Sequence, residues 1–69
     1  MNYFVKNLKY LTKNKINQNQ LAILLNVSRQ AIGNLLKTND PRANTLIKIS
    51  DIYKISIDDL LRKDLEVEQ

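Results

Sequence analysis

Two short helical segments on either side of a single asparagine constrain the fold of this chain more than any other feature of its sequence. Asn17 can cap the first segment, because Gln20 follows it at the spacing of a capping box. Asn26 then interrupts the apolar periodicity, and asparagine adopts the left-handed conformation of a sharp turn more readily than most residues. Ser28 can cap a second segment that continues to about Lys37. The pattern predicts two helices joined by a tight turn.

The second of these helices has two chemically different sides. Its apolar side is formed by Ile32, Leu35 and Leu36. The opposite side lacks large apolar residues and consists of Arg29, Gln30, Gly33, Asn34 and Lys37. Polar side chains of these types hydrogen-bond base edges and phosphates. The stretch therefore predicts a helix-turn-helix whose second helix, from about Ser28 to Lys37, contacts DNA.

The spacing of apolar residues along this motif is specific. Counting from Gln18, the fourth, eighth, tenth, fifteenth and eighteenth places hold Leu21, Leu25, Val27, Ile32 and Leu35. The fifth place holds the small residue Ala22. This spacing resembles that of the Cro/repressor-type family, also described as XRE-like or lambda-repressor-like, with Asn26 in place of the family's turn glycine. The resemblance continues through residues 41–61, and it implies an all-α, five-helix lambda-repressor-like DNA-binding domain.

The composition excludes several other classes of protein. A chain of 69 residues makes one small domain, near the lower limit for a core that needs neither metal nor disulfides. It contains no cysteine and no histidine, which removes a disulfide scaffold, the usual soft metal ligands and the commonest general base. We expect no enzymatic activity, no cofactor and no metal. The first residues lack the apolar run of a signal peptide or a membrane span, so we expect a cytoplasmic protein.

Charge is distributed unevenly along the chain. Residues 1–38 contain six basic and no acidic residues, for a net charge of +6. Residues 39–69 contain five basic and seven acidic residues, for a net charge of −2, and the two halves sum to +4. A basic half that holds the helix-turn-helix, followed by an acidic half, is the polarity expected of a DNA-binding domain. A merely solvated lysine surface is the alternative.

A first helix over residues 3–14 is indicated by three apolar residues at helical spacing, Phe4, Leu8 and Leu11. Many members of the family carry an ion pair between an arginine in this helix and a glutamate after the DNA-contacting helix. The glutamate position is Leu36 here, and the arginine position is Thr12, or Leu11 if no gap is allowed. The resemblance therefore implies an apolar contact in place of the ion pair, an exchange that is often neutral or stabilising.

The clearest break in the chain comes after Lys37. We expect Asn39 to adopt a left-handed conformation there. The next helix should begin at residues 41–45, with either Asp40 or Asn44 as its cap. A last helix should begin at Ser56, which has capping-box spacing to an aspartate.

The apolar pattern predicts one core in a single domain, residues 1–63, followed by a tail, residues 64–69. The tail can be extended, helical or disordered. The expected core consists of Leu8, Leu11, Ile16, Leu21, Ala22, Leu25, Val27, Ile32, Leu35, Leu36, Leu46, Ile49, Ile52, Ile57 and Leu60.

Candidate DNA contacts fall into two groups. Those expected to contact bases are Arg29, Gln30, Gly33 and Asn34. Those expected to contact phosphates are Gln18, Ser28, Lys37, Thr38, Asn39, Arg42 and Asn44. For Arg29, bidentate binding to a guanine and binding to a phosphate remain equal alternatives. Gly33 costs helix stability, which a close approach of DNA to the backbone would explain; drift at a tolerant site is the other explanation.

The leading hypothesis is a sequence-specific DNA-binding transcriptional regulator of the XRE family. We expect a repressor that binds an inverted-repeat operator in double-stranded DNA as a homodimer, with no membrane association and no evident small-molecule ligand. Leu61, Leu65 and Val67 are candidates for the dimer contact, unless they merely cover their own domain. The alternative function is a protein-interaction module, or an antitoxin-type partner-binding protein, on the same fold.

Overall fold

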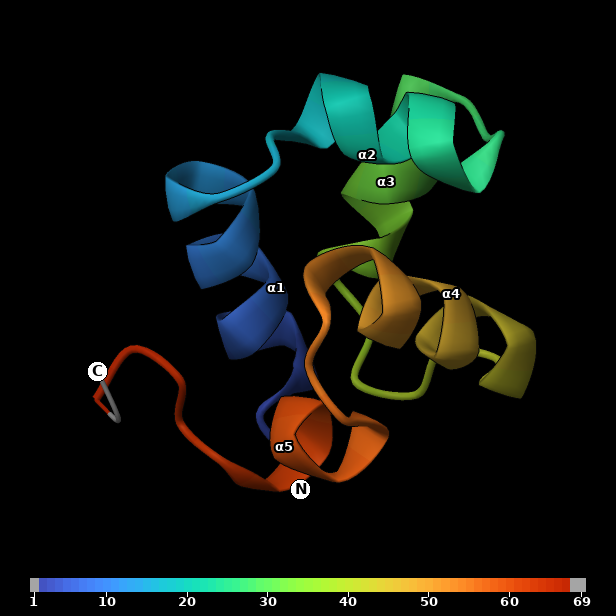
Figure 1. Cartoon of the computed structure of the whole chain (residues 1–69). Helices are drawn as coiled ribbons and strands as arrows, with labels where there is room; N and C mark the ends of the chain where they lie inside the picture. The colour runs from blue at the N-terminus through green and yellow to red at the C-terminus, as the bar shows by residue number, and fades with distance from the viewer. Residues whose placement is uncertain (1, 68–69) are drawn as a thin grey trace.

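The computed structural model describes residues 2–67, which form five helices and no strand (Figure 1). The helices are α1 (Phe4–Asn14), α2 (Gln18–Leu25), α3 (Arg29–Leu35), α4 (Ala43–Tyr53) and α5 (Ile57–Arg62). α2 packs against α1, α3 and α4, whereas α5 packs against α1 and α4. The predicted all-α, five-helix architecture is confirmed.

Three predicted helix caps are present, and each fixes where a helix begins. The side chains of Asn17, Ser28 and Ser56 accept hydrogen bonds from the backbone N–H groups of Gln20, Ala31 and Asp59, at 2.9, 3.1 and 3.1 Å. Each such cap contributes about 1 kcal/mol to stability. Asn26 ends α2 in the predicted left-handed conformation, with φ of 58°.

The core lies where α1, α2, α4 and α5 meet, with one side chain from α3. Its buried apolar residues are Phe4, Leu8, Leu11, Leu21, Ala22, Leu25, Ile32, Ile49 and Leu60. Five more residues of the predicted core are half-buried and pack against this cluster: Ile16, Leu35, Leu36, Leu46 and Ile52. A chain of this length has too little interior to enclose them completely. Leu36 and Leu11 thus both contribute to the core, whereas Thr12, the other candidate for the arginine position, is buried and its hydroxyl donates to the Leu8 carbonyl oxygen at 2.9 Å.

Two residues of the predicted core lie elsewhere. Val27 is 42% exposed, because it faces an open hollow beside α4 instead of the packed interior. Ile57 is half-exposed at the first position of α5 and is not among the residues packed on the core. Val27 lies in the turn between α2 and α3, and Ile57 begins α5, so both lie at the ends of helices, where apolar spacing does not show how closely a neighbouring element packs.

The prediction for the segment between α3 and α4 also needs correction. Asn39 is not left-handed; within residues 2–67, positive φ angles occur at Asn26 and Lys54 alone. Instead, the Asn39 Oδ1 atom accepts a hydrogen bond from the Val5 N–H at 3.1 Å. α4 begins at Ala43 after an extended Arg42 and without a side-chain cap, so neither predicted cap is used.

The segment after α5 is attached to α1. Asn7 is fully buried, and its Nδ2 group donates to the carbonyl oxygens of Leu60 and Lys63, both at 2.7 Å. Its Oδ1 atom accepts from the Leu65 N–H at 3.0 Å. Lys6 also forms an ion pair with Asp64. The hydrogen bond from Lys6 lowers the pKa of Asp64, and the same bond raises the pKa of Lys6. The start of the predicted tail is therefore held in place.

A second attachment joins α4 to the segment between α1 and α2. The Tyr53 hydroxyl donates to the Ile16 carbonyl oxygen at 2.8 Å. Burial raises the pKa of Tyr53 to about 12. The phenol therefore keeps its proton, and this hydrogen bond, across the physiological pH range.

Candidate nucleic-acid interface

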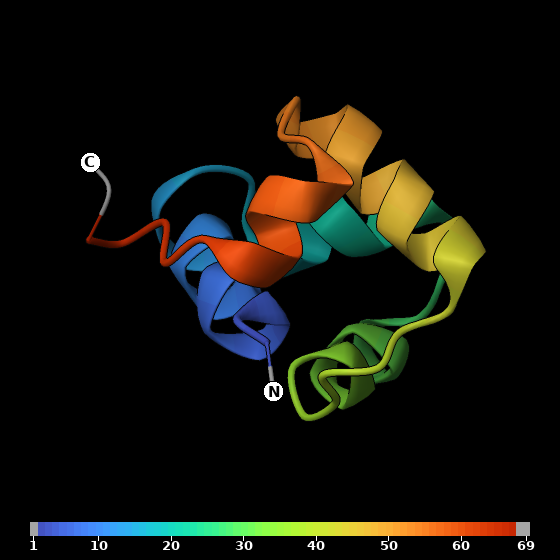
Figure 2. The ribbon, with the colours of Figure 1, turned by 90° about the horizontal axis from the view of Figure 1, so that it is seen from below.

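α3 lies at the edge of the domain. Figure 2 shows it apart from α1 and α5. Ile32 is the one residue of α3 that is fully buried, and it fastens the helix to α2. Gln30 and Asn34 are exposed on the outer side, as predicted. The helix ends at Leu35, so Lys37 lies in the turn that follows and not on the helix itself.

Gly33 lies on α3 with open space around it. A methyl group built at this position would have no neighbouring atom within 4 Å. Nothing inside the domain therefore requires a glycine here. Alanine would be accommodated and would favour the helix by about 1 kcal/mol. The absence of a side chain has to be explained from outside the domain or by drift.

Arg29 joins the first turn of α3 to the first turn of α2. Its Nε group donates to Gln18 Oε1 at 3.1 Å, and its Nη1 group donates to Asn19 Oδ1 at 2.7 Å. Arginine has five N–H donors, so three remain free. Because both amides turn their oxygens to the guanidinium, their own NH₂ groups are left to donate elsewhere. The free N–H groups of Arg29 and the amide NH₂ groups of Gln18 and Asn19 thus lie close together around one positive charge. Such a cluster can bind a phosphate.

The hydrogen bonds of Arg29 affect the interpretation of Arg29 itself and of Asn19. They favour the phosphate alternative for Arg29, because a guanidinium bonded to α2 is held back from the base edges. They also identify Asn19, which the sequence analysis missed. The signal available was its place beside Gln18 in the first turn of α2, but the partnership with Arg29 spans ten residues and depends on the angle between the helices.

The other candidates for phosphate contact differ in whether their side chains already form hydrogen bonds with neighbouring residues. Ser28 uses its oxygen as a helix cap and keeps its own proton to donate. Thr38 accepts a hydrogen bond from the Asp40 N–H at 3.2 Å. Arg42 and Asn44 are exposed. Asn39 is turned toward α1, and its carbonyl oxygen also accepts from Asn2 Nδ2 at 2.8 Å. Asn39 thus holds the loop in position.

The cations near α3 have no carboxylate partner. Within residues 2–67, ion pairs join Lys6 to Asp64, Arg62 to Asp58 and Lys63 to Asp59. All three lie on α1, α5 and the segment after it. Arg29, Lys37 and Arg42 therefore present uncompensated charge, and the polarity expected from the sequence is present in space. Such a surface attracts a polyanion.

Other exposed apolar side chains lie on α2 and in the segment after α5. Leu61 and Leu65, two of the three candidates for a dimer contact, are half-buried and pack on their own core. Val67, the third, is 73% exposed. Ile23 and Leu24 on α2 are 78% and 56% exposed, and the sequence analysis did not identify them as a surface.

Comparison with known proteins agrees with this geometry. No helix among residues 2–67 is long and apolar enough to cross a membrane. Searches of curated proteins and of solved structures found no match. A family model described as Helix-turn-helix, HTH_3, matches residues 8–60. This range spans α2, α3 and α4 completely, together with most of α1 and α5, which is well over half of the chain. The chain therefore belongs to the HTH_3 family, the XRE-type helix-turn-helix proteins that bind DNA.

Proposed function

We propose that this protein is a sequence-specific transcriptional regulator, a repressor, which places α3 in the major groove of its operator. The observation that carries the proposal is the outer side of α3. Gln30 and Asn34 are exposed on it, and Arg29 at its start is fixed to α2. A helix with free amides along one side and an anchored cation at its end can read bases and hold its register on the backbone.

Footprinting on the DNA that flanks its own gene is the test of this function. A protected inverted repeat that overlaps the promoter, with reduced transcription when the protein is added, supports a repressor. Binding that stays equal on flanking and random DNA would reject sequence-specific regulation. The salt concentration must be held constant, because phosphate contacts alone produce strong binding at low salt.

Gln30→Ala and Asn34→Ala are expected to change specificity. Each amide can bond an adenine at N6 and N7, so each variant should lose about 1–3 kcal/mol of discrimination at a single base pair. Lys37→Ala is the control, because a phosphate contact carries no sequence information. It should weaken binding to all sequences evenly and lower the salt slope by about one unit. Binding selections from randomised operators measure both effects. Equal losses on every sequence for all variants would contradict the assignment to bases.

Gly33→Ala is expected to stabilise the free domain and weaken its complex with DNA. Open space around the position means that the methyl group meets no clash, so the free energy of unfolding should rise by about 0.5–1 kcal/mol. If DNA approaches the backbone here, operator affinity should fall by about tenfold, equivalent to about 1.4 kcal/mol. Urea unfolding and operator titration measure the two quantities. Higher stability with unchanged affinity would show that the glycine has no role in DNA binding and arose by drift at a tolerant site.

The proposed repressor acts as a homodimer on an inverted repeat. A single helix reads only a few base pairs, too few to select one site among genomic competitors. Two copies of α3 should lie about 34 Å apart on one face of the DNA. Because Leu61 and Leu65 pack on their own core, Val67 is the candidate that is most free to make a contact. So small a patch favours a weak dimer that DNA completes.

Val67→Asp is expected to weaken this dimer without unfolding the domain, because the side chain is 73% exposed. Leu65→Asp would be a poor test, since Leu65 packs on the core and its N–H bonds Asn7. Sedimentation across concentrations should show weaker self-association for Val67→Asp, and binding to the full inverted repeat should lose cooperativity. A protein that remains a monomer and binds a half-site as tightly as the full repeat would contradict the dimer.

The alternative of a partner-binding protein is favoured by one observation. Ile23 and Leu24 are exposed side by side on α2, next to Ile16, around a depression of about 310 Å³. Exposed apolar groups of this size can serve as anchors for another protein. Ile23→Lys separates the two functions: it should leave DNA binding unchanged and abolish any protein complex formed through α2.

A further inference from the structure

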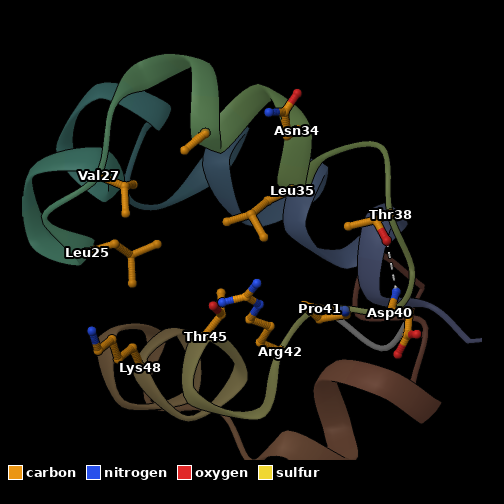
Figure 3. Close-up of a pocket in the computed structure, with 11 residues that line it drawn as sticks. Leu25, Val27, Asn34, Leu35, Thr38, Asp40, Pro41, Arg42, Thr45 and Lys48 are labelled. Carbon is orange, nitrogen blue, oxygen red and sulfur yellow. Dashed lines mark hydrogen bonds between the residues drawn. The ribbon is translucent and has the colours of Figure 1, made fainter.

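A hollow of about 560 Å³ separates the helix-turn-helix from the first half of α4. Figure 3 shows Leu25, Val27 and Leu35 pointing from the helix-turn-helix toward residues of α4 and of the loop before it. The volume falls within the range of about 300–1,000 Å³ that is typical of small-molecule sites. Its walls do not pack on each other, which is why Val27 remains 42% exposed.

The two walls differ in chemistry. The helix-turn-helix side is mainly apolar: Ala31 joins the three side chains above, and the polar residues Asn34 and Thr38 lie at its margin. The opposite side carries two cations, Arg42 and Lys48, and the hydroxyl of Thr45. The two walls do not pair with each other: the apolar wall lacks apolar contact, and the two exposed cations are left to solvent.

Neither cation has a counter-charge within the domain. No ion pair among residues 2–67 involves Arg42 or Lys48, and α4 begins without a side-chain cap. Asp40 is the one acidic residue that lines the hollow. In Figure 3 its carboxylate points away from the space between the cations and the apolar wall. The net field inside the hollow is therefore positive.

We propose that this hollow binds a small amphipathic anion, with a carboxylate at Arg42 and Lys48 and an apolar body against Leu25, Val27 and Leu35. A guanidinium is the preferred protein partner of a carboxylate. The apolar body fills contact area that the domain itself leaves open. The proposal does not rest on the proposed regulatory function, because the site lies within one free domain and binding can be measured without DNA.

Amide NMR shifts of the free protein, titrated with phenylbutyrate, test the proposal. The neutral analogue phenylbutanol isolates the contribution of the carboxylate, and inorganic phosphate isolates the charge. We expect saturable shifts at Val27, Ala31, Leu35 and Thr45, with a dissociation constant on the order of 1 mM for a ligand of this size. Phenylbutanol should bind about tenfold more weakly, because it lacks the charge-assisted hydrogen bonds.

Two variants localise the site. Arg42→Gln removes one cation from an exposed side chain that takes part in no ion pair among residues 2–67, so the fold should be retained. Binding of phenylbutyrate should weaken by about five- to tenfold. Val27→Asp places a like charge on the apolar wall and should abolish binding. Lys9→Gln is the matched control, with the same loss of charge at an exposed position on α1, and it should bind as the wild type does.

Three results would overturn the proposal. The first is the absence of saturable shifts with phenylbutyrate. The second is equal binding of phenylbutanol, which would make the site merely apolar. The third is a pair of titrations in which inorganic phosphate causes the same shifts as phenylbutyrate, and in which Val27 and Leu35 respond to neither ligand. That last result would assign Arg42 to simple anions, including the DNA backbone.

Discussion

Asn7→Ala should lower the free energy of unfolding by about 2–4 kcal/mol, a large part of the stability of a domain this small. The side chain is fully buried and makes three hydrogen bonds, to the carbonyls of Leu60 and Lys63 and to the N–H of Leu65. Truncation would leave these three backbone groups without partners, and an orphaned buried polar group costs about 1–3 kcal/mol. The hydrogen bonds to Lys63 and Leu65 are only partly buried, so water can reach those two backbone groups. The expected loss is therefore smaller than the sum of three such costs.

Urea unfolding followed by circular dichroism measures the effect, and Asn14→Ala is the control. Asn14 is on the same helix, and its amide donates to the Tyr10 carbonyl at 2.9 Å, but it is exposed to water. Its replacement should change stability by less than about 0.5 kcal/mol. If Asn7→Ala costs no more than Asn14→Ala, the attachment of the C-terminal segment to α1 contributes nothing to stability.

The sequence predicted the parts of this fold that depend on local interactions. A cap is formed between residues three apart, so Asn17, Ser28 and Ser56 could be identified from spacing alone. The left-handed Asn26 follows from the conformational preference of its own residue type. Elements of this kind need no knowledge of how the helices pack.

Interactions between distant residues could not be predicted in the same way. Asn39 was expected to end a helix, but it bonds to Val5, thirty-four residues away. Asn7 carried no signal at all, because an asparagine in the middle of a helix is usually exposed. Lys54, which ends α4 with φ of 57°, is not a residue type that favours this conformation. In each case packing between helices outweighed the preference of the residue.

The candidate site likewise contains residues that local spacing predicts and residues whose role depends on how the helices pack. The outer side of α3 follows from helical periodicity, so the exposure of Gln30 and Asn34 could be predicted. The role of Arg29 could not, since it depends on the distance between the first turns of two helices. Its two hydrogen bonds to α2 support the phosphate alternative, which the experiment below tests.

Arg29→Ala should weaken DNA binding by about 10- to 100-fold on the operator and on random DNA alike, because hydrogen bonds to a charged group contribute about 1.5–3 kcal/mol. The stability of the free domain should change little, since the side chain is exposed. Lys37→Ala is the matched control, a cation beyond the end of α3 that does not take part in the hydrogen bonds between Arg29 and α2, and it should cost only a few-fold. Titration of both DNAs at one salt concentration measures these losses.

A loss confined to one base pair of the operator would contradict the phosphate assignment and show that Arg29 reads a guanine. Arg29→Lys separates charge from geometry: lysine keeps the charge but cannot bond Gln18 and Asn19 in the fixed fork of a guanidinium. An intermediate loss is therefore expected. The double variant Arg29→Ala with Gln18→Ala tests whether the two residues act together, because the effects of substituting residues that bind one phosphate as a unit do not add. If the guanidinium orients the Gln18 amide, Gln18→Ala should cost much less in the Arg29→Ala background than in the wild type.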